Sequence, residues 1–272
     1  MDLGIKKKVI IVSGGSTGIG EGISRLLAEE GAIPIIAANS TEGGIKLENE
    51  LKNKGKSAHF IDVELGSQEN CRRVISETIE IYGRIDGLIN NAGDNDRIGL
   101  EHGCPEEFLN SLQKNLFHYY CLAHYSLPEL KKSAGAIVNI GSKTAVTGQG
   151  NTSGYAASKG AQLALTREWA VELLPYGIRV NAVVPAEVLT PMYEKWLKTF
   201  KNPEQKLQYI IKNIPLGNRM TTPEEIASMT VYLISEQASH ITGQIIYVDG
   251  GYVHLDRALA GISNDSTKNS ES

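Results

Sequence analysis

Tyr155 and Lys159 are the two side chains of this sequence whose types and spacing best suit the movement of a proton. They lie four residues apart at the start of a stretch with helical periodicity, so they share one face of a helix. An ammonium group beside a phenol favours the phenolate, which lowers the tyrosine pKa from its reference of about 10 toward neutral pH. Tyr155 is therefore predicted to act as a general acid/base between an alcohol and a carbonyl. Ser142 follows a short apolar run and is placed to hydrogen-bond the reacting oxygen. A lone Tyr-x-x-x-Lys pair more often belongs to a solvated helix face. The other motifs of the sequence therefore decide whether this pair is catalytic.

A glycine-rich turn near the N-terminus suits the binding of a pyrophosphate. The apolar run 8–13 leads into Gly14-Gly15-Ser16-Thr17-Gly18-Ile19-Gly20 and then into a helical stretch. Small residues let the backbone approach the ligand, and the start of a helix offers free N–H groups and a positive dipole end. The spacing is Gly-x-x-x-Gly-x-Gly, and its place between strand and helix favours a dinucleotide site over an ordinary tight turn. The same residues fit the nucleophile elbow of hydrolases, but only His254 follows a strand in the order that a hydrolase needs.

The end of the second strand normally selects between the two nicotinamide cofactors. A carboxylate there hydrogen-bonds the ribose 2′-hydroxyl and repels a 2′-phosphate. This sequence has Ala37-Ala38-Asn39-Ser40, with neither an acid nor an arginine. NAD and NADP both stay open, and we favour NADP because Asn39 and Ser40 can donate to its phosphate.

Short β-branched runs alternate with longer stretches of helical period between residues 8 and 249. The runs are apolar almost throughout, which is typical of parallel strands covered on both faces. We expect strands at 8–13, 33–38, 58–62, 87–90, 136–140, 178–184 and 244–248, with helices at 19–30, 68–82, 105–127, 155–174 and 223–235. This alternation predicts right-handed crossovers and a doubly wound, Rossmann-like α/β fold of about seven parallel strands.

No break in composition divides the chain, so residues 1–262 are interpreted as one dinucleotide-binding and catalytic domain. Residues 188–218 separate a strand from the next helix, which is the usual place for a substrate lid. The polar segment 263–272 is predicted to be a flexible C-terminal tail.

Composition excludes several classes of protein. The 272 residues are 41% hydrophobic and 21% charged with a net charge of −4, so the chain is globular and has no electrostatic footprint for nucleic acid. Apolar runs such as 9–12 fall short of the ~20 residues of a membrane span, and the first residues lack the apolar run of a secretory signal. Three scattered cysteines form neither a disulfide framework nor a metal cluster. We expect a cytoplasmic protein that binds no metal.

Several motifs, in order along nearly the whole chain, resemble the classical short-chain dehydrogenase/reductases. Gly14, Gly18 and Gly20 match the cofactor turn of that family, Asp62-Val63 stands where the family contacts adenine, and Asn90-Asn91-Ala92-Gly93 matches the signature after the fourth strand. Asn115, Ser142, Tyr155 and Lys159 match the catalytic tetrad. The resemblance implies that Tyr155 is the acid/base, Lys159 also holds the nicotinamide ribose, Ser142 orients the substrate and Asn115 supports a water relay. A polar residue that kinks its helix is compatible with this last role.

The resemblance also completes the expected cofactor site. Its residues are Gly14, Ser16, Thr17, Gly18, Ile19, Gly20, Asn39, Ser40, Asp62, Val63, Asn91, Ala92, Gly93, Tyr155, Lys159, Pro185, Val188 and Thr190. Two positions depart from the family pattern: Ser13 replaces a threonine but keeps the hydroxyl, and Ala186 replaces a glycine after Pro185. Alanine disfavours positive φ, so the loop beneath the nicotinamide is expected to follow a different path.

Residues 185–196 together with Gly148-Gln149 look like the branch of the family that contains L-fucose dehydrogenases. A sugar needs several fixed donors and acceptors because its hydroxyls must be paired when they leave water. The expected substrate residues are Ser142, Gln149, Tyr155 and Glu187, although Glu187 is equally compatible with an exposed loop acid. The hypothesis is oxidation of an aldose such as L-fucose to its lactone.

Two other functions stay open at this point. A 3-oxoacyl thioester reductase would need basic residues to receive an acidic acyl carrier protein, and Lys131-Lys132 in the core helices is the basic pair considered for that contact. A nucleotide-sensing binding protein without chemistry would not need the four catalytic residues.

The family resemblance further implies self-association as a dimer or tetramer. The expected contacts are residues 105–130, 154–174 and 244–249, and the segment 250–257 either approaches a neighbouring subunit or lies on its own.

Overall fold

Seven short apolar segments lie side by side as a parallel sheet in the computed structural model, which describes residues 2–255. The strands are β1 (Val9–Ser13), β2 (Ile33–Ala38), β3 (His59–Asp62), β4 (Gly87–Asn90), β5 (Ala136–Ile140), β6 (Arg179–Pro185) and β7 (Ile245–Val248). Their order across the sheet is β3-β2-β1-β4-β5-β6-β7, and every neighbouring pair is parallel. The predicted strands and the single doubly wound α/β domain are confirmed, each strand within one residue at either end.

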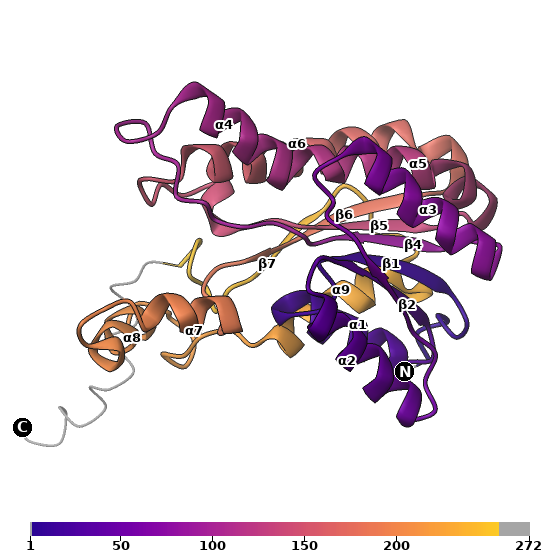
Figure 1. Cartoon of the computed structure of the whole chain (residues 1–272), viewed down its shortest axis with the longest axis horizontal. Coiled ribbons are helices and arrows are strands. Elements are labelled where there is room, and N and C mark those ends of the chain that lie inside the picture. The colour runs from indigo at the N-terminus through magenta and orange to yellow at the C-terminus, as the bar shows by residue number, and fades with distance from the viewer. Residues whose placement is uncertain (1, 256–272) are drawn as a thin grey trace, which may run out of the picture.

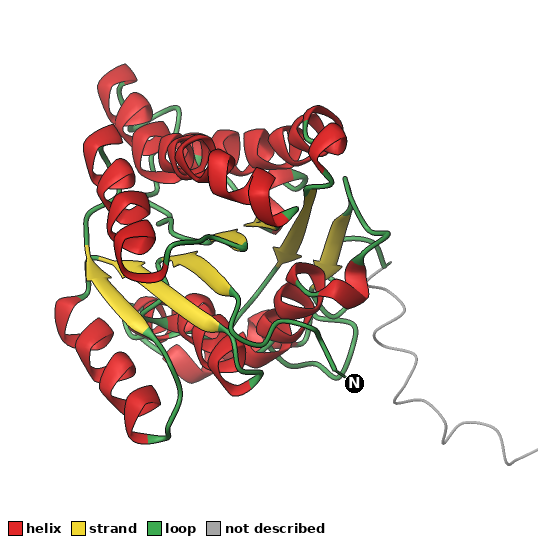
Figure 2. Ribbon diagram, turned by 90° about the vertical axis from the view of Figure 1, so that its right-hand side faces the viewer, coloured by secondary structure: helices red, strands yellow, loops and turns green. Residues whose placement is uncertain are grey.

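Two layers of helices cover the sheet. The helices are α1 (Gly18–Glu29), α2 (Thr41–Asn53), α3 (Gln68–Tyr82), α4 (Pro105–Leu112), α5 (His118–Ser133), α6 (Ser153–Glu172), α7 (Pro191–Leu197), α8 (Pro203–Ile211) and α9 (Pro223–Ile234). Helices α3, α5 and α6 lie over one face, and α1, α2 and α9 lie under the other (Figure 1). Figure 2 shows the strands between these layers. The strands read as continuous apolar runs because both faces are buried.

The main cores lie on the two faces of the sheet. One packs Ile11 and Leu88 against Val74 of α3, Leu122 of α5 and Trp169 of α6. The other packs neighbouring strand residues against α1 and α9. Burial of these apolar side chains stabilises the fold by roughly 25 cal/mol for each Å² of apolar surface removed from water. This burial is the main source of the free energy that holds the strand ends in register.

Three segments differ from the sequence-based expectation. The helix expected over 105–127 is interrupted by a π-helical turn, Gln113–Phe117, between α4 and α5. Helix α2 was not expected, because its apolar face is short and only Gly44, Leu47 and Leu51 are buried. The segment 188–218 contains α7 and α8, which project from the rest of the domain (Figure 1).

Both helices of the segment 188–218 begin on a side-chain cap. Thr190 accepts a hydrogen bond from the Tyr193 backbone N–H, Asn202 accepts one from Gln205, and a proline follows each cap. Few of their side chains are buried, as in segments that open locally at low cost. The predicted tail at 263–272 lies outside the described residues. Within residues 2–255, no helix is long and apolar enough to cross a membrane.

Candidate active site

The strand order reverses between β1 and β4, and the carboxyl ends of these strands carry the glycine turn and the Asn90–Gly93 segment. Such a switch point is where open α/β sheets bind ligands. The Ser13 hydroxyl at the end of β1 accepts hydrogen bonds from the backbone N–H groups of Asn91 (2.9 Å) and Ala92 (3.1 Å). The Asn91 amide donates back to the carbonyls of Ser13 and Gly14 at 3.0 and 3.2 Å. Ser13 therefore ties the two segments together through the hydroxyl that it shares with threonine.

The glycine turn leaves room only for backbone. Gly14 and Gly18 have φ of +63° and +56°. A Cβ on Gly20 would lie 2.0 Å from the Gly14 carbonyl oxygen, and one on Gly18 would lie 3.3 Å from the methyl group of Thr190. The Thr17 side chain does not cap the first turn of α1. The turn therefore presents uncapped N–H groups and a positive dipole end, which fits the pyrophosphate of a dinucleotide.

Two carboxylates from the neighbouring strand β3 and the turn after it, Asp62 and Glu64, lie at the end of β2. The exposed Asn39 amide donates to Glu64 at 2.5 Å, and the Thr41 hydroxyl donates to Asp62 at 2.6 Å. Val63 bonds the Ala38 carbonyl at 2.9 Å, which holds the Asp62-Val63 pair beside this strand end. Glu64 thus places an acid at the end of β2, supplied by the turn after β3 rather than by β2 itself.

Helix α6 places Lys159 at the end of β5. The buried ammonium donates to the Ile140 carbonyl at 2.8 Å and to the Tyr119 hydroxyl at 3.4 Å. Its nitrogen also lies 5.5 Å from the centroid of the Tyr155 ring. Tyr119 itself donates to the same carbonyl at 3.1 Å. Tyr155 and Lys159 therefore share one environment, as their spacing predicted, although the lysine binds backbone and Tyr119.

The protonation of this pair differs from the expectation. Burial lowers the pKa of Lys159 to about 7, because its ammonium has left water without a carboxylate partner. Burial also raises the pKa of Tyr155 to about 12, partly offset by its hydrogen bond with Ser142 and increased by the charge of Asp94. The predicted lowering of the Tyr155 pKa is therefore wrong for the chain alone. Desolvation is the largest cause of this shift, and spacing along a helix cannot reveal it.

Ser142 follows β5 and is held by the turn that it begins. Its hydroxyl oxygen accepts hydrogen bonds from the backbone N–H (3.3 Å) and the hydroxyl (3.1 Å) of Thr144. Both acceptor positions are filled, so the serine proton is left to donate toward Tyr155 or a substrate oxygen. These contacts are compatible with the orienting role that the resemblance implies for Ser142, which stays a prediction.

Asn115 lies in the π-helical turn, a feature often found at functional sites. Its side-chain oxygen accepts from the Asp94 backbone N–H at 2.8 Å, and its carbonyl accepts from the buried Gln162 amide at 2.6 Å. A Cβ on Gly93 would lie 2.9 Å from that side-chain oxygen and 3.9 Å from the Lys159 nitrogen. Asn115 and Lys159 therefore meet at Gly93, beside the glycine turn.

The two expected substrate residues outside the tetrad lie in different surroundings. Glu187 is bonded by Lys143 and by the Tyr193 hydroxyl, the latter at 2.8 Å, and only 12% of its side chain is exposed. Gln149 is exposed in the turn before α6, with no hydrogen bond to any described residue. Ala186 avoids positive φ, as its replacement of glycine predicted.

Sequence reasoning missed several residues around the tetrad. Lys143 directly follows Ser142, Tyr119 lies one helical turn after Asn115, and Gln162 lies two turns after Tyr155. Helical spacing could have identified Tyr119 and Gln162. Lys143 contacts Glu187 forty-four positions away, and no local signal reveals that contact. Among residues 2–255, no cluster of His, Cys, Asp or Glu is arranged to hold a metal ion.

Comparisons with known proteins match this arrangement over almost the whole chain. A family model described as enoyl-(acyl carrier protein) reductase matches residues 14–253. An L-fucose dehydrogenase from Oryctolagus cuniculus is 36% identical, with 90% of this chain and 84% of the relative covered. A 3-oxoacyl-[acyl-carrier-protein] reductase from Thermotoga maritima is 34% identical, with 92% and 99% covered.

Solved structures share the same fold. The crystal structure of Cj0485 dehydrogenase is 48% identical with a TM-score of 0.90, covering 95% of this chain and 99% of that one. Aldohexose dehydrogenase from Thermoplasma acidophilum is 31% identical with a TM-score of 0.84, covering 93% and 96%. L-sorbose reductase from Gluconobacter frateurii, solved with NADPH and L-sorbose, is 28% identical with a TM-score of 0.90, covering 94% and 100%.

Proposed function

Because the chain belongs to the short-chain dehydrogenase/reductase family, we propose that this nicotinamide-dependent oxidoreductase oxidises a free aldose such as L-fucose at its anomeric carbon. The observation that supports the reaction type is the grouping of Tyr155, Ser142 and Lys159 at the end of β5, next to Gly93 and the glycine turn. The names of the relatives, which include an L-fucose dehydrogenase and an aldohexose dehydrogenase, favour a sugar as substrate.

The oxidation removes one hydride and one proton from the sugar. A bound oxidised nicotinamide would supply the acceptor for the hydride of C1, and the lactone carbonyl would form as the C1 hydroxyl loses its proton. We assign acceptance of that proton to the Tyr155 oxygen, and orientation of the substrate oxygen to Ser142. With a pKa of about 12, Tyr155 is protonated at neutral pH, so it needs a neighbouring positive charge before it can act as a base. Lys159, whose nitrogen lies 5.5 Å from the centroid of the Tyr155 ring, can supply this charge only while it is protonated, and its pKa is about 7.

The residues at the strand ends have distinct proposed roles in holding the cofactor. The turn from Gly14 to Gly20 would hold the pyrophosphate, and Asp62-Val63 the adenine. Asn91-Ala92-Gly93 and Lys159 would line the ribose and nicotinamide, with Pro185, Val188 and Thr190 closing the other side. The proximity of Thr190 to Gly18 supports this arrangement, because a Cβ on Gly18 would lie 3.3 Å from the threonine methyl group, which places the start of the segment 188–218 beside the glycine turn.

The reduction of a 3-oxoacyl thioester is the second candidate, since one relative carries that name. The basic pair Lys131-Lys132, considered for an acidic acyl carrier, already has partners within the chain: Lys132 bonds Glu129 at 2.5 Å, and Lys131 lies 3.7 Å from the centroid of the Tyr176 ring. These contacts favour the sugar.

A substrate panel tests the proposal. Purified chain with NAD or NADP is expected to oxidise L-fucose, D-arabinose and L-galactose with a kcat/KM at least tenfold above that for simple secondary alcohols. Acetoacetyl thioester reduction with the reduced cofactors is expected to be slower still. Thioester reduction without turnover of any of the three sugars would replace this function by the second candidate.

For the choice of cofactor, we propose that Asn39 and Ser40 bind the 2′-phosphate of NADP and that Glu64 opposes it. Glu64 holds the Asn39 amide and places a negative charge at this strand end. Glu64→Gln is expected to raise kcat/KM for NADP about tenfold, corresponding to roughly 1.4 kcal/mol, while kcat/KM for NAD changes less than twofold. Glu69→Gln, in the first turn of α3, is the matched control. Equal changes with both cofactors would contradict the assignment.

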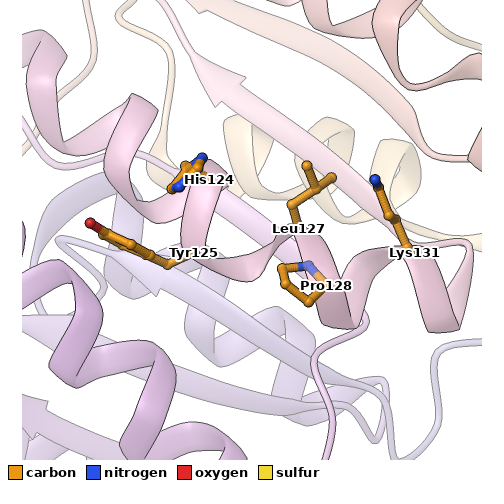
Figure 3. A pocket seen from close by; sticks show the side chains of 5 residues that line it. All are labelled: His124, Tyr125, Leu127, Pro128 and Lys131. Atoms are coloured by element: carbon orange, nitrogen blue, oxygen red, sulfur yellow. The ribbon is translucent and has the colours of Figure 1, made fainter.

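We propose that the chain self-associates through the outer faces of α5 and α6. Tyr120 and Val171 expose 51% and 69% of their surface there. A shallow pocket of about 410 Å³ lies on the same side of α5, lined by His124, Tyr125, Leu127, Pro128 and Lys131 (Figure 3). Val171→Glu is expected to shift the sedimentation coefficient of the full chain toward the monomer, because a buried unpaired charge is costly. Glu168→Ala, one turn earlier, is the control, and an unchanged coefficient for Val171→Glu would exclude this face.

A further inference from the structure

A buried ion pair with two tyrosines lies next to the catalytic serine. Lys143 follows Ser142 in the chain, and its ammonium bonds the Glu187 carboxylate. Each side chain is only 12% exposed. The other Glu187 oxygen accepts the Tyr193 hydroxyl at 2.8 Å, and Lys143 also donates to the Tyr252 hydroxyl at 3.4 Å and lies 4.4 Å from the centroid of that ring. We call these four residues the Lys143–Glu187 cluster.

Four separate segments build this cluster, all at the carboxyl ends of the strands. Lys143 follows β5, Glu187 follows β6, Tyr193 lies in α7 and Tyr252 follows β7. A buried ion pair contributes little stability, because its attraction is largely offset by the loss of hydration. Stability alone therefore does not explain why the ion pair is present.

The cluster retains hydrogen-bonding capacity after its internal contacts are made. A carboxylate has about four acceptor positions, and the contacts given above use one on each Glu187 oxygen. The two oxygens can each accept one further hydroxyl proton. The Lys143 ammonium has three protons, and these contacts use two of them. Two adjacent acceptors beside a fixed cation suit a pair of neighbouring hydroxyl groups.

The cluster is joined directly to the catalytic serine along the chain. Ser142 and Lys143 are consecutive, and Ser142 is held by Thr144. We infer that a hydroxyl bound at the Lys143–Glu187 cluster belongs to a carbon close to the one whose oxygen Ser142 orients, because the two residues share one turn. In an aldose oxidised at C1, the nearest candidate is the hydroxyl on C2.

We propose that the Lys143–Glu187 cluster recognises the C2 hydroxyl of the aldose and so makes the enzyme specific for substrates with a hydroxyl beside the reacting carbon. This inference rests on the proposed oxidation at C1. Glu187 accepts the hydroxyl proton, Lys143 donates to the hydroxyl oxygen, and Tyr193 and Tyr252 hold the two charges in place. Burial and the neighbouring carboxylate hold the pKa of Tyr193 well above its usual range. The phenol therefore stays protonated and continues to donate its hydrogen bond to Glu187.

D-arabinose and 2-deoxy-D-ribose test this assignment, because they differ only by the C2 hydroxyl. The wild-type ratio of their kcat/KM values is expected to exceed about 100, since a site built to pair a hydroxyl rejects an analogue without it. Glu187→Gln and Lys143→Met are each expected to lower that ratio at least tenfold, mainly through loss of D-arabinose turnover. Tyr193→Phe is expected to lower it about threefold.

Lys8→Met is the matched control, because it breaks an ion pair with Glu236 at the amino end of β1, whereas the cluster lies at the carboxyl ends of the strands. Its ratio is expected to equal that of the wild type. Should Glu187→Gln and Lys143→Met reduce turnover of both sugars by the same factor, the cluster only holds the fold, and the assignment is overturned while sugar oxidation stands. Failure of the wild type to oxidise either sugar would remove the proposed function and the assignment together.

Discussion

Replacement of Tyr155 by phenylalanine is expected to reduce kcat about 1,000-fold, because a positioned acid/base contributes roughly 100- to 10,000-fold to rate. The substitution removes one oxygen from a half-buried ring, and that oxygen contacts Ser142. Cofactor binding is expected to change less than threefold, since the glycine turn and Lys159 are left in place. Steady-state rates on L-fucose or D-arabinose, with cofactor affinity from fluorescence titration, provide the measurement.

Tyr82→Phe is the matched control for Tyr155→Phe. Tyr82 is also partly buried, and burial likewise raises its pKa, but it lies at the end of α3 away from the glycine turn. Its substitution is expected to leave kcat within twofold of the wild type. Unchanged turnover in Tyr155→Phe would refute the assigned role of the phenol. A wild type that binds the cofactor but turns over no substrate would instead identify a nucleotide-sensing protein.

Replacement of Lys159 by methionine is expected to lower kcat/KM by at least 100-fold and to raise the melting temperature at pH 7. The stability gain follows from the lowered pKa of about 7 for the buried ammonium. Below pH 7 both folded and unfolded chains carry the proton, so the full desolvation penalty is present. As pH rises from about 7 to 10.5, the folded lysine has lost its proton while the unfolded one still holds it, so stability rises with pH and the penalty disappears.

The expected gain at pH 7 is about 2 kcal/mol, which is less than the pKa shift alone implies because the bond to the Ile140 carbonyl is lost. This corresponds to several degrees in melting temperature for a chain of this length. The increase in melting temperature of Lys159→Met over the wild type is expected to shrink as the pH approaches 10. Differential scanning calorimetry at several pH values measures this change. Lys46→Met, at an exposed position of α2, is expected to give no gain. A pH-independent loss of stability in Lys159→Met would contradict the burial argument.

These two variants separate two consequences of the same burial. Neither residue carries its charge readily in the chain alone. Tyr155 is protonated and therefore neutral at pH 7, and Lys159 is close to losing its proton. An active site that stabilises charge only when its ligands are present has to retain such groups at a cost in stability. Tyr155→Phe tests the proton transfer, and Lys159→Met tests the cost in stability of burying the Lys159 ammonium.

The sequence by itself determined the parallel sheet, the glycine turn and the order of the catalytic residues. Strands buried on both faces are apolar throughout, so β2, β4 and β5 can be delimited to the residue without any partner. The starts of α7 and α8 were not predicted, although Thr190-Pro191 and Asn202-Pro203 carry the same capping residue and proline that begin α9 at Thr222-Pro223.

Only the tertiary structure decided the chemistry of these residues. The π-helical turn at Asn115 is supported by Gln162 from another helix, and the Lys143–Glu187 ion pair joins loops after different strands. The pKa shifts of Tyr155 and Lys159 have opposite signs because both charged forms are disfavoured by burial. Spacing along a helix indicates which groups are neighbours. Their ionisation depends on how much water and how many partners the rest of the fold leaves to each, and these are long-range properties of the packed chain.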